Sequence, residues 1–142
     1  MTAEQKHLLR KSFGAVESTP LVAALIFYRR LFELNPRLRS LFKTDIEVQA
    51  AKLVEMLRVS LGLLEQPEVL TKELEQLGAR HVNYGVKPEH YAMVGQALLE
   101  MLAQVQPGGL DPQTRAAWVE LYGMIETTML RGAERAHELQ RS

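Results

Sequence analysis

The chain has 142 residues, an apolar share of 46%, and 17 basic residues balanced by 17 acidic ones, which fits one folded domain and argues against disorder. The balance of charge argues against a surface for nucleic acid or for an anionic membrane. The sequence contains no cysteine, and this excludes disulfides, thiol catalysis, zinc fingers and iron–sulfur clusters.

Two helices are predicted for the first quarter of the chain. Residues 2–5, Thr-Ala-Glu-Gln, form a capping box that starts a helix running to about Glu17. Thr19 caps the second helix, and Pro20 lies in its first turn, where the missing N–H costs nothing. This helix ends near Asn35-Pro36. Its shared apolar face is formed by Leu21, Leu25, Tyr28 and Phe32.

The middle of the chain is predicted to hold a short helical turn and two longer helices. The turn contains Leu38, Leu41 and Phe42. Asp45 caps a helix from about Ile46 to Leu64, and Pro67 starts a further helix that ends near His81. The faces of these two helices consist of Gln49, Leu53, Met56 and Leu57 in the first and of Leu70, Leu74 and Leu77 in the second.

Two more helices are predicted for the last third of the chain. Pro88-Glu89 opens the first of them, a loop follows at 106–109, and Asp111-Pro112 caps the second. Residues 131–142 form the polar end of that last helix or a tail. Alternation typical of strands is absent. We therefore expect an all-α single domain over residues 1–142 with six to eight helices.

His81 is the candidate metal ligand. It continues the leucine face of its helix by one turn and precedes a break at Tyr84-Gly85-Val86. An imidazole at this position fits an iron ligand in an apolar pocket, and it also fits an ordinary half-buried histidine. The spacing by itself favours the ordinary histidine, because a lone histidine is a weak motif.

Several further elements occur in a specific order along the chain. They are Leu41-Phe42, the segment 49–53 (Gln-Ala-Ala-Lys-Leu), Arg80-His81 with the break after it, the segment 86–91 (Val-Lys-Pro-Glu-His-Tyr), Ala117-Trp118, and Tyr122. From about Glu4 to Leu130, this pattern resembles the globin family. The resemblance is to the single-domain bacterial globins and to the haem domain of flavohaemoglobins. It implies a globin fold around a haem pocket.

The resemblance implies haem b, held non-covalently because no cysteine is present to attach it. His81 would bind the iron through one ring nitrogen. Tyr28 and Gln49 would donate hydrogen bonds to bound dioxygen and leave a five-coordinate iron open to a gas. The alternatives are a core tyrosine bonded to a backbone carbonyl and a glutamine that solvates a helix face. Direct ligation of ferric iron by Gln49 or Tyr28 also stays open.

The walls of this pocket follow from the same resemblance. Leu53 would pack over the iron, and Lys52 would pair with a propionate at the haem edge unless it is an ordinary surface lysine. The remaining wall residues are expected to be Phe42, Leu57, Leu77, Val86, Tyr91 and Val94.

One departure concerns the surroundings of the proximal histidine. Flavohaemoglobins place a tyrosine and a glutamate there, and Tyr91 matches the tyrosine. The position that matches the glutamate is Ala133, and the neighbouring Glu134 is rotated from it by about 100° on a helix. This lowers the expectation of peroxidase-like chemistry. Glu126 is another carboxylate of the last helix, but the sequence does not place it.

Three functions are compatible with these features. The first is reversible binding of dioxygen or another diatomic gas (CO or NO). The second is a nitric oxide dioxygenase that needs a separate reductase, since the chain ends before a flavin or nicotinamide domain. The third is a helical interaction protein without haem, which the presence of His81, Gln49 and Phe42 disfavours.

The expected setting is a cytoplasmic protein that is a monomer or a weak homodimer and binds neither nucleic acid nor membrane. The apolar run 21–27 is too short to span a bilayer, and Tyr28-Arg29-Arg30 ends it.

Overall fold

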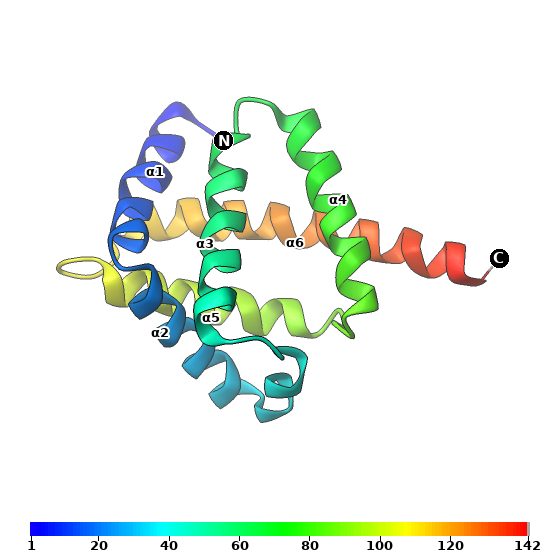
Figure 1. Ribbon diagram of the computed structural model, residues 1–142. Helices are drawn as coiled ribbons and strands as arrows, with labels where there is room; N and C mark the ends of the chain where they lie inside the picture. Colours follow the sequence, from blue (N-terminus) through cyan, green and yellow to red (C-terminus); the bar gives the residue numbers. More distant parts are fainter. Residues whose placement is uncertain (142) are drawn as a thin grey trace.

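The computed structural model describes residues 1–141, and this part of the chain is helical and without strands (Figure 1). The predicted all-α fold class is thereby confirmed. The elements are α1 (Ala3–Ser18), α2 (Pro20–Leu34), a 3₁₀ helix η1 (Pro36–Leu41), α3 (Ile46–Gly62), α4 (Pro67–Asn83), α5 (His90–Val105) and α6 (Pro112–Arg141). Residues 131–141 continue α6, so the predicted polar end is helical as far as Arg141.

The helix starts lie at the predicted caps, although not every cap uses its side chain. Thr2 and Gln5 form both bonds of the capping box, at 3.1 and 2.8 Å. Thr19 precedes α2, but its side chain makes no capping bond there, and its hydroxyl donates instead to the carbonyl of Ala15, 3.0 Å away in α1. Asp111 accepts from the backbone N–H of Thr114 at 2.9 Å and caps the first turn of α6.

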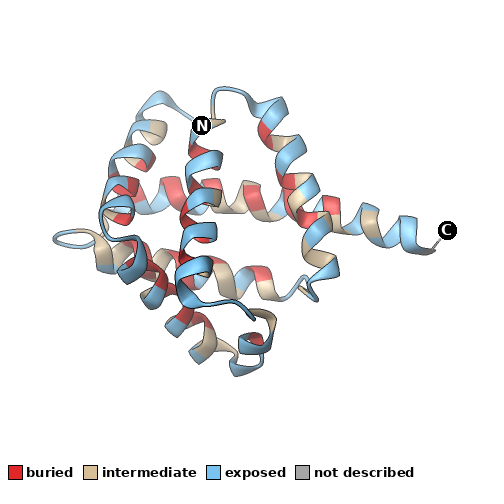
Figure 2. Cartoon of the chain, in the orientation of Figure 1, coloured by how far each residue is buried: buried red, intermediate tan, exposed pale blue. Residues whose placement is uncertain are grey.

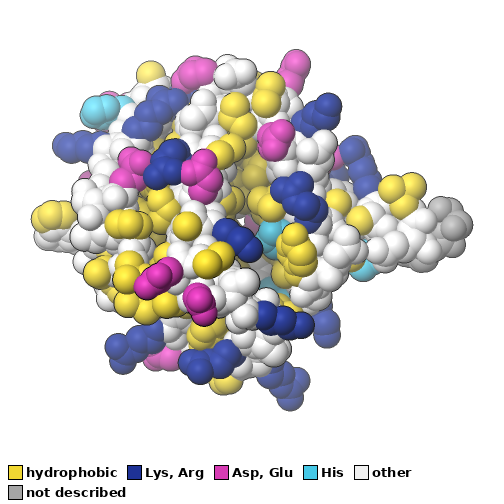
Figure 3. Space-filling model, viewed as in Figure 1, with side chains coloured by type: hydrophobic (Ala, Val, Ile, Leu, Met, Phe, Trp, Pro, Cys, Tyr) yellow, Lys and Arg dark blue, Asp and Glu magenta, His cyan; other side chains and the backbone are white. Residues whose placement is uncertain are grey.

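Buried residues follow the inner face of each helix, and exposed residues follow the outer face (Figure 2). The face of the molecule seen in Figure 3 carries acidic and basic side chains interspersed, in keeping with a formal net charge of zero. Among the described residues, none of the helices has both the length and the apolar content that crossing a lipid bilayer requires.

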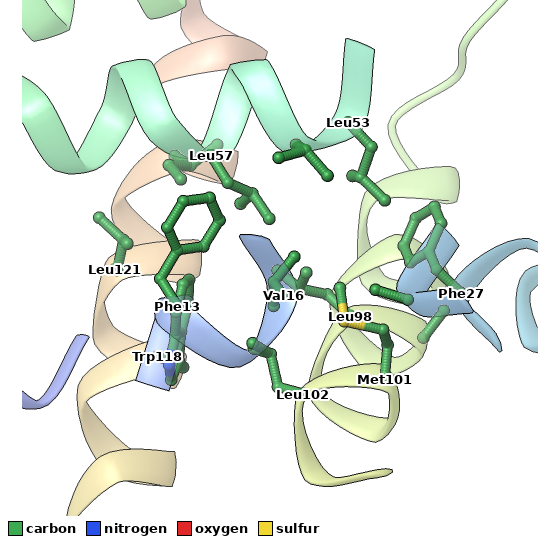
Figure 4. Packing of buried hydrophobic residues seen from close by; sticks show 14 of the residues in the cluster. Phe13, Val16, Phe27, Leu53, Leu57, Leu98, Met101, Leu102, Trp118 and Leu121 are labelled. Carbon is green, nitrogen blue, oxygen red and sulfur yellow. The ribbon is translucent and has the colours of Figure 1, made fainter. Parts of the chain in front are cut away.

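The core is centred on Trp118, which is fully buried. Its Nε1–H donates to the hydroxyl of Ser12 at 2.8 Å, and that hydroxyl donates in turn to the carbonyl of Leu8 at 2.7 Å. Figure 4 shows Phe13 between Trp118 of α6 and Leu57 of α3. The indole of Trp118 and the hydroxyl of Ser12 are thus satisfied within one network, which joins α1 to α6.

Helix α4, which carries His81, is held mainly by α6. It crosses α6 in close contact, whereas its contacts with α3 and α5 are slight (Figure 1). Two glycines allow this close packing. A Cβ atom on Gly78 of α4 would lie 2.0 Å from the carbonyl oxygen of Met129, and one on Gly132 of α6 would lie 1.9 Å from that of Glu75. Backbone therefore meets backbone at the crossing, and this contact sets where His81 lies.

Replacing either crossing glycine is expected to destabilise the fold. Gly78→Ala and Gly132→Ala each force a methyl group into backbone atoms, and we expect a loss of about 1–3 kcal/mol in the free energy of unfolding. Gly123→Ala is the matched control, since a Cβ atom on this α6 glycine meets nothing within 4 Å. It should be neutral or stabilising by up to about 1 kcal/mol. Urea unfolding followed by circular dichroism measures all three, and wild-type stability in both crossing variants would contradict the prediction.

Candidate functional site

A cavity of about 620 Å³ lies between α3 and α4, which we call the α3–α4 cavity. Its volume is in the range of small-molecule and cofactor sites, roughly 300–1,000 Å³. Figure 3 shows it as a hollow with hydrophobic atoms inside and charged side chains around it. The lining residues are Val48, Ala51, Lys52, Glu55, Met56, Val59 and Ser60 of α3 and Leu70, Glu73, Leu74, Leu77 and Arg80 of α4.

His81 lies half-buried in the last turns of α4, one turn after Leu77. Its Nδ1 lies 2.8 Å from the carbonyl oxygen of Leu77. Since a carbonyl only accepts, Nδ1 carries the proton and Nε2 carries the free lone pair. Burial lowers the pKa of His81, the bond to Leu77 opposes this, and the positive charge of Arg80 lowers it further. The ring is therefore neutral at pH 7, the form that ligates a metal.

The turn after α4 closes directly on His81. The backbone N–H groups of Tyr84 and Val86 both donate to the carbonyl of His81, each at 3.1 Å. Gly85 between them has a φ of +87°, a conformation that favours glycine. The ring of Tyr84 lies beside the imidazole, with 5.7 Å between the ring centroids. The predicted break at 84–86 thus ends the helix and fixes the histidine's surroundings.

Tyr28 and Gln49, the two predicted gas contacts, lie next to each other. Tyr28 is buried, and burial raises its pKa to about 12. Its hydroxyl donates to the backbone carbonyl of Gln49 over 3.4 Å, which is long for such a bond. The side-chain amide of Gln49 donates to the hydroxyl of Thr44. Both side chains are therefore bonded to the protein itself, and their role toward a gas stays a prediction.

A second, smaller cavity of about 170 Å³ lies where α2, η1 and α3 meet, and we call it the corner cavity. The ring centroids of Tyr28 and Phe42 are 5.0 Å apart in its wall, edge to face. The residues that line it are Tyr28, Phe32, Arg39, Phe42, Thr44, Ile46 and Gln49. Three residues predicted from sequence therefore meet here, together with an arginine and a threonine that the sequence did not single out.

The other predicted wall residues are distributed unevenly. Lys52 and Leu77 line the α3–α4 cavity. Leu53 and Leu57 lie on the buried face of α3, within the core. The residues that line neither of the two cavities but pack in or against the core are Leu53, Leu57, Val86, Tyr91 and Val94. Arg80 is a second cation beside the α3–α4 cavity, and sequence reasoning named only Lys52 there.

The structure places Glu126, which the sequence alone does not place, near two tyrosines. Tyr122 stacks its ring against Gly95 and donates its hydroxyl to the carbonyl of Tyr91 at 2.6 Å. Burial raises the pKa of Tyr91 and Tyr122, and the negative charge of Glu126 raises both further. Glu126 therefore lies near both phenols. The spacing in the sequence could have indicated that Glu126 lies near Tyr122, since it follows Tyr122 by one helical turn and shares its face of α6.

The raised pKa of Tyr28 predicts a loss of stability in alkali. The unfolded phenol ionises near pH 10 and the folded one near pH 12. The contribution of Tyr28 is therefore complete below about pH 10 and is lost as the pH rises through 12. An absorbance titration of phenolate in wild type and Tyr28→Phe measures this. The substitution should remove a late-ionising phenol, and removal of one ionising near pH 10 would contradict the assignment.

Comparisons with known proteins bear on the family and the fold of the chain. The family model described as Globin matches residues 25–129. Neuroglobin from Tetraodon nigroviridis is 27% identical, over 93% of this chain and 92% of its own. A flavohemoprotein from Vibrio cholerae is 26% identical over 86% of this chain, which spans only 32% of that protein's length. The structure of a bacterial globin from Campylobacter jejuni has 23% identity and a TM-score of 0.82, covering 96% of this chain and 99% of that one.

Proposed function

The chain belongs to the globin family, as the resemblance predicted, and on this premise we propose that it binds haem b non-covalently and holds dioxygen or another diatomic gas reversibly. When bound, haem supplies an iron atom that takes the gas. The observation that carries the proposal is the state of His81: its Nδ1–H is bonded to Leu77 and its Nε2 is free. The apolar α3–α4 cavity beside this helix supports the same conclusion.

His81 would hold the iron in a fixed orientation. The bond from Nδ1 to the carbonyl of Leu77 sets the tautomer and the plane of the ring. A carbonyl is a neutral acceptor, so it raises the basicity of the imidazole less than a carboxylate would. Lys52 and Arg80 are cations at the α3–α4 cavity and would pair with the carboxylates of the porphyrin.

Tyr28 and Gln49 would slow the release of the gas. The 3.4 Å bond from Tyr28 to the carbonyl of Gln49 is weak, so little energy is lost when the hydroxyl turns to a new acceptor. The amide of Gln49 is a second donor close by. The ring of Phe42, 5.0 Å from that of Tyr28, supplies apolar surface beside these donors, and a less polar surrounding strengthens such bonds.

A second candidate function is nitric oxide dioxygenation, which the similarity to a flavohemoprotein over 86% of the chain favours. One nitric oxide, one dioxygen and one electron give one nitrate ion, and a separate reductase would supply the electron. We would distinguish the two functions by nitrate production with such a reductase. Slow turnover in protein that binds gas normally would leave reversible binding as the function.

Replacing His81 is expected to abolish normal haem binding. His81→Ala removes the only imidazole that we assign to the iron, and we expect affinity to fall by about 100-fold or more. The measurement is the Soret absorption of protein titrated with haem, in ferric, ferrous and carbon-monoxide forms. His90→Ala is the matched control, because His90 accepts a bond from the backbone of Lys87 at the start of α5. An unchanged spectrum and affinity in His81→Ala would rule the proposal out.

Replacing Tyr28 is expected to speed the release of oxygen. Tyr28→Phe keeps the ring that packs on Phe42 and removes the hydroxyl donor. One lost hydrogen bond in an apolar site predicts an oxygen dissociation rate about tenfold higher, measured by stopped flow. Carbon monoxide dissociation is the control, since this less polar gas depends less on a donor. An unchanged oxygen rate would remove Tyr28 from the gas contact.

A further inference from the structure

The outer side of α2 carries a group of exposed apolar side chains, which we call the α2 patch. Its members are Leu21, Val22 and Leu25, whose exposed fractions are 41, 53 and 49%. They lie on one side of the helix, because Leu25 follows each of the other two by about one turn. The sequence pattern groups both leucines with Tyr28 on one face. In the structure the ring of Phe42 packs on the buried Tyr28, whereas the leucines, one and two turns earlier, stay at the surface.

Helix α2 is apolar on both of its sides over this stretch. Residues 20–28 contain no charged residue. The inner side is buried in the core through Ala23, Ala24 and Phe27. A helix at a protein surface normally has polar residues on its outer side, and a helix that is apolar all round is normally buried. The composition of α2 therefore indicates that a second molecule covers the α2 patch.

Charged side chains lie at both ends of the α2 patch. At the end nearer α1, Arg58 pairs with Glu17 at 3.1 Å and also with Glu55, so two carboxylates share one cation. At the other end, one turn beyond the patch, the side chain of Arg29 is 85% exposed and its pair with Glu33 is long, at 3.7 Å. Figure 3 shows hydrophobic side chains gathered at the lower left, over α2, with acidic and basic side chains along their border. The patch therefore lies between an excess of negative charge and an arginine that is only weakly paired.

This arrangement fits a second copy of the chain better than a lipid surface. About a twofold axis, α2 meets its own copy in the reverse direction, so that the patch lies on the patch. An axis between Val22 and Leu25 also brings Arg29 of one protomer beside Glu17 of the second copy. A helix that lies on a bilayer instead carries mainly lysine and arginine next to its apolar face. The carboxylates of Glu17 and Glu55 would be repelled by anionic lipid.

We propose that two copies of the chain associate through α2 as a weak homodimer, with the α2 patches in contact and Arg29 of each copy paired with Glu17 of the other. Three apolar side chains from each protomer make a small contact, below the roughly 1,200 Å² of total buried area at which stable complexes begin. We therefore expect a Kd on the order of 0.1 mM. None of the patch residues lines the α3–α4 cavity or the corner cavity. The dimer thus goes beyond the proposed gas binding and does not depend on it.

The first test is sedimentation equilibrium of the full chain from about 10 µM to about 1 mM, a range that spans the expected Kd. Leu25→Glu places like charges in contact across the axis and should weaken association about tenfold or more. Val119→Glu is the matched control, because this residue of α6 is 44% exposed and lies outside the patch. It should associate as the wild type does. A wild-type chain that stays monomeric throughout this range, or equal weakening by the two glutamate variants, would overturn the proposal.

A charge exchange tests the direction of the two helices. Arg29→Glu and Glu17→Arg should each weaken association several-fold, because each brings like charges together, and the double variant should restore it. No gain of the double variant over the single ones would rule out the antiparallel contact.

Cross-linking keeps the proposal testable even if a glutamate variant fails to fold. The sequence contains no cysteine, so a single introduced one reports only its own surroundings. Val22→Cys, close to the proposed axis, should give a covalent dimer with a short bismaleimide reagent, whereas Val119→Cys should give much less. Equal yields would overturn the contact. So would wild-type protein that sediments with vesicles of phosphatidylcholine and phosphatidylserine through Leu25 but does not self-associate, since the patch would then bind lipid.

Discussion

The crossing of α4 on α6 is the constraint on which the candidate site depends. Gly78 and Gly132 allow the two backbones to come into contact, and most contacts of α4 with other helices are made with α6. Because α4 is fixed to α6, it does not close onto α3, although the two helices follow each other in the chain. The α3–α4 cavity is the result. A core otherwise packed around Trp118 therefore keeps a large apolar space beside the helix that carries His81.

Much of the fold could be predicted from local signals. The capping box at Thr2, the prolines at the starts of α2 and α4, and the apolar spacing of each helix act within a few residues, and the structure has helices at these places. Thr19 shows the limit of such signals. Its residue type and position fit an N-cap, but in the structure its side chain makes no capping bond and its hydroxyl donates to Ala15 of the preceding helix.

The candidate site was less predictable, because it depends on side-chain rotamers and on contacts between residues of different helices. The helical position of His81 followed from the leucine spacing, but its bond to Leu77 and its free Nε2 depend on a rotamer. Glu126 was visible in the sequence and had no partner there, since Tyr91 comes from another helix. The corner cavity brings Arg39 of η1 to Thr44 and Tyr28 by tertiary packing alone. The periodicity of apolar residues within one helix carries no information on contacts between side chains of different helices.

The bond between Trp118 and Ser12 has a practical consequence. Trp118 is the single tryptophan of the sequence, and it is fully buried at the contact of α1 with α6. Its fluorescence therefore comes from one place in the molecule. Emission should shift to longer wavelength when water reaches the α1–α6 contact, and energy transfer to a bound porphyrin should quench it. The protein thus contains its own optical reporter, which follows unfolding and pigment uptake without an attached dye.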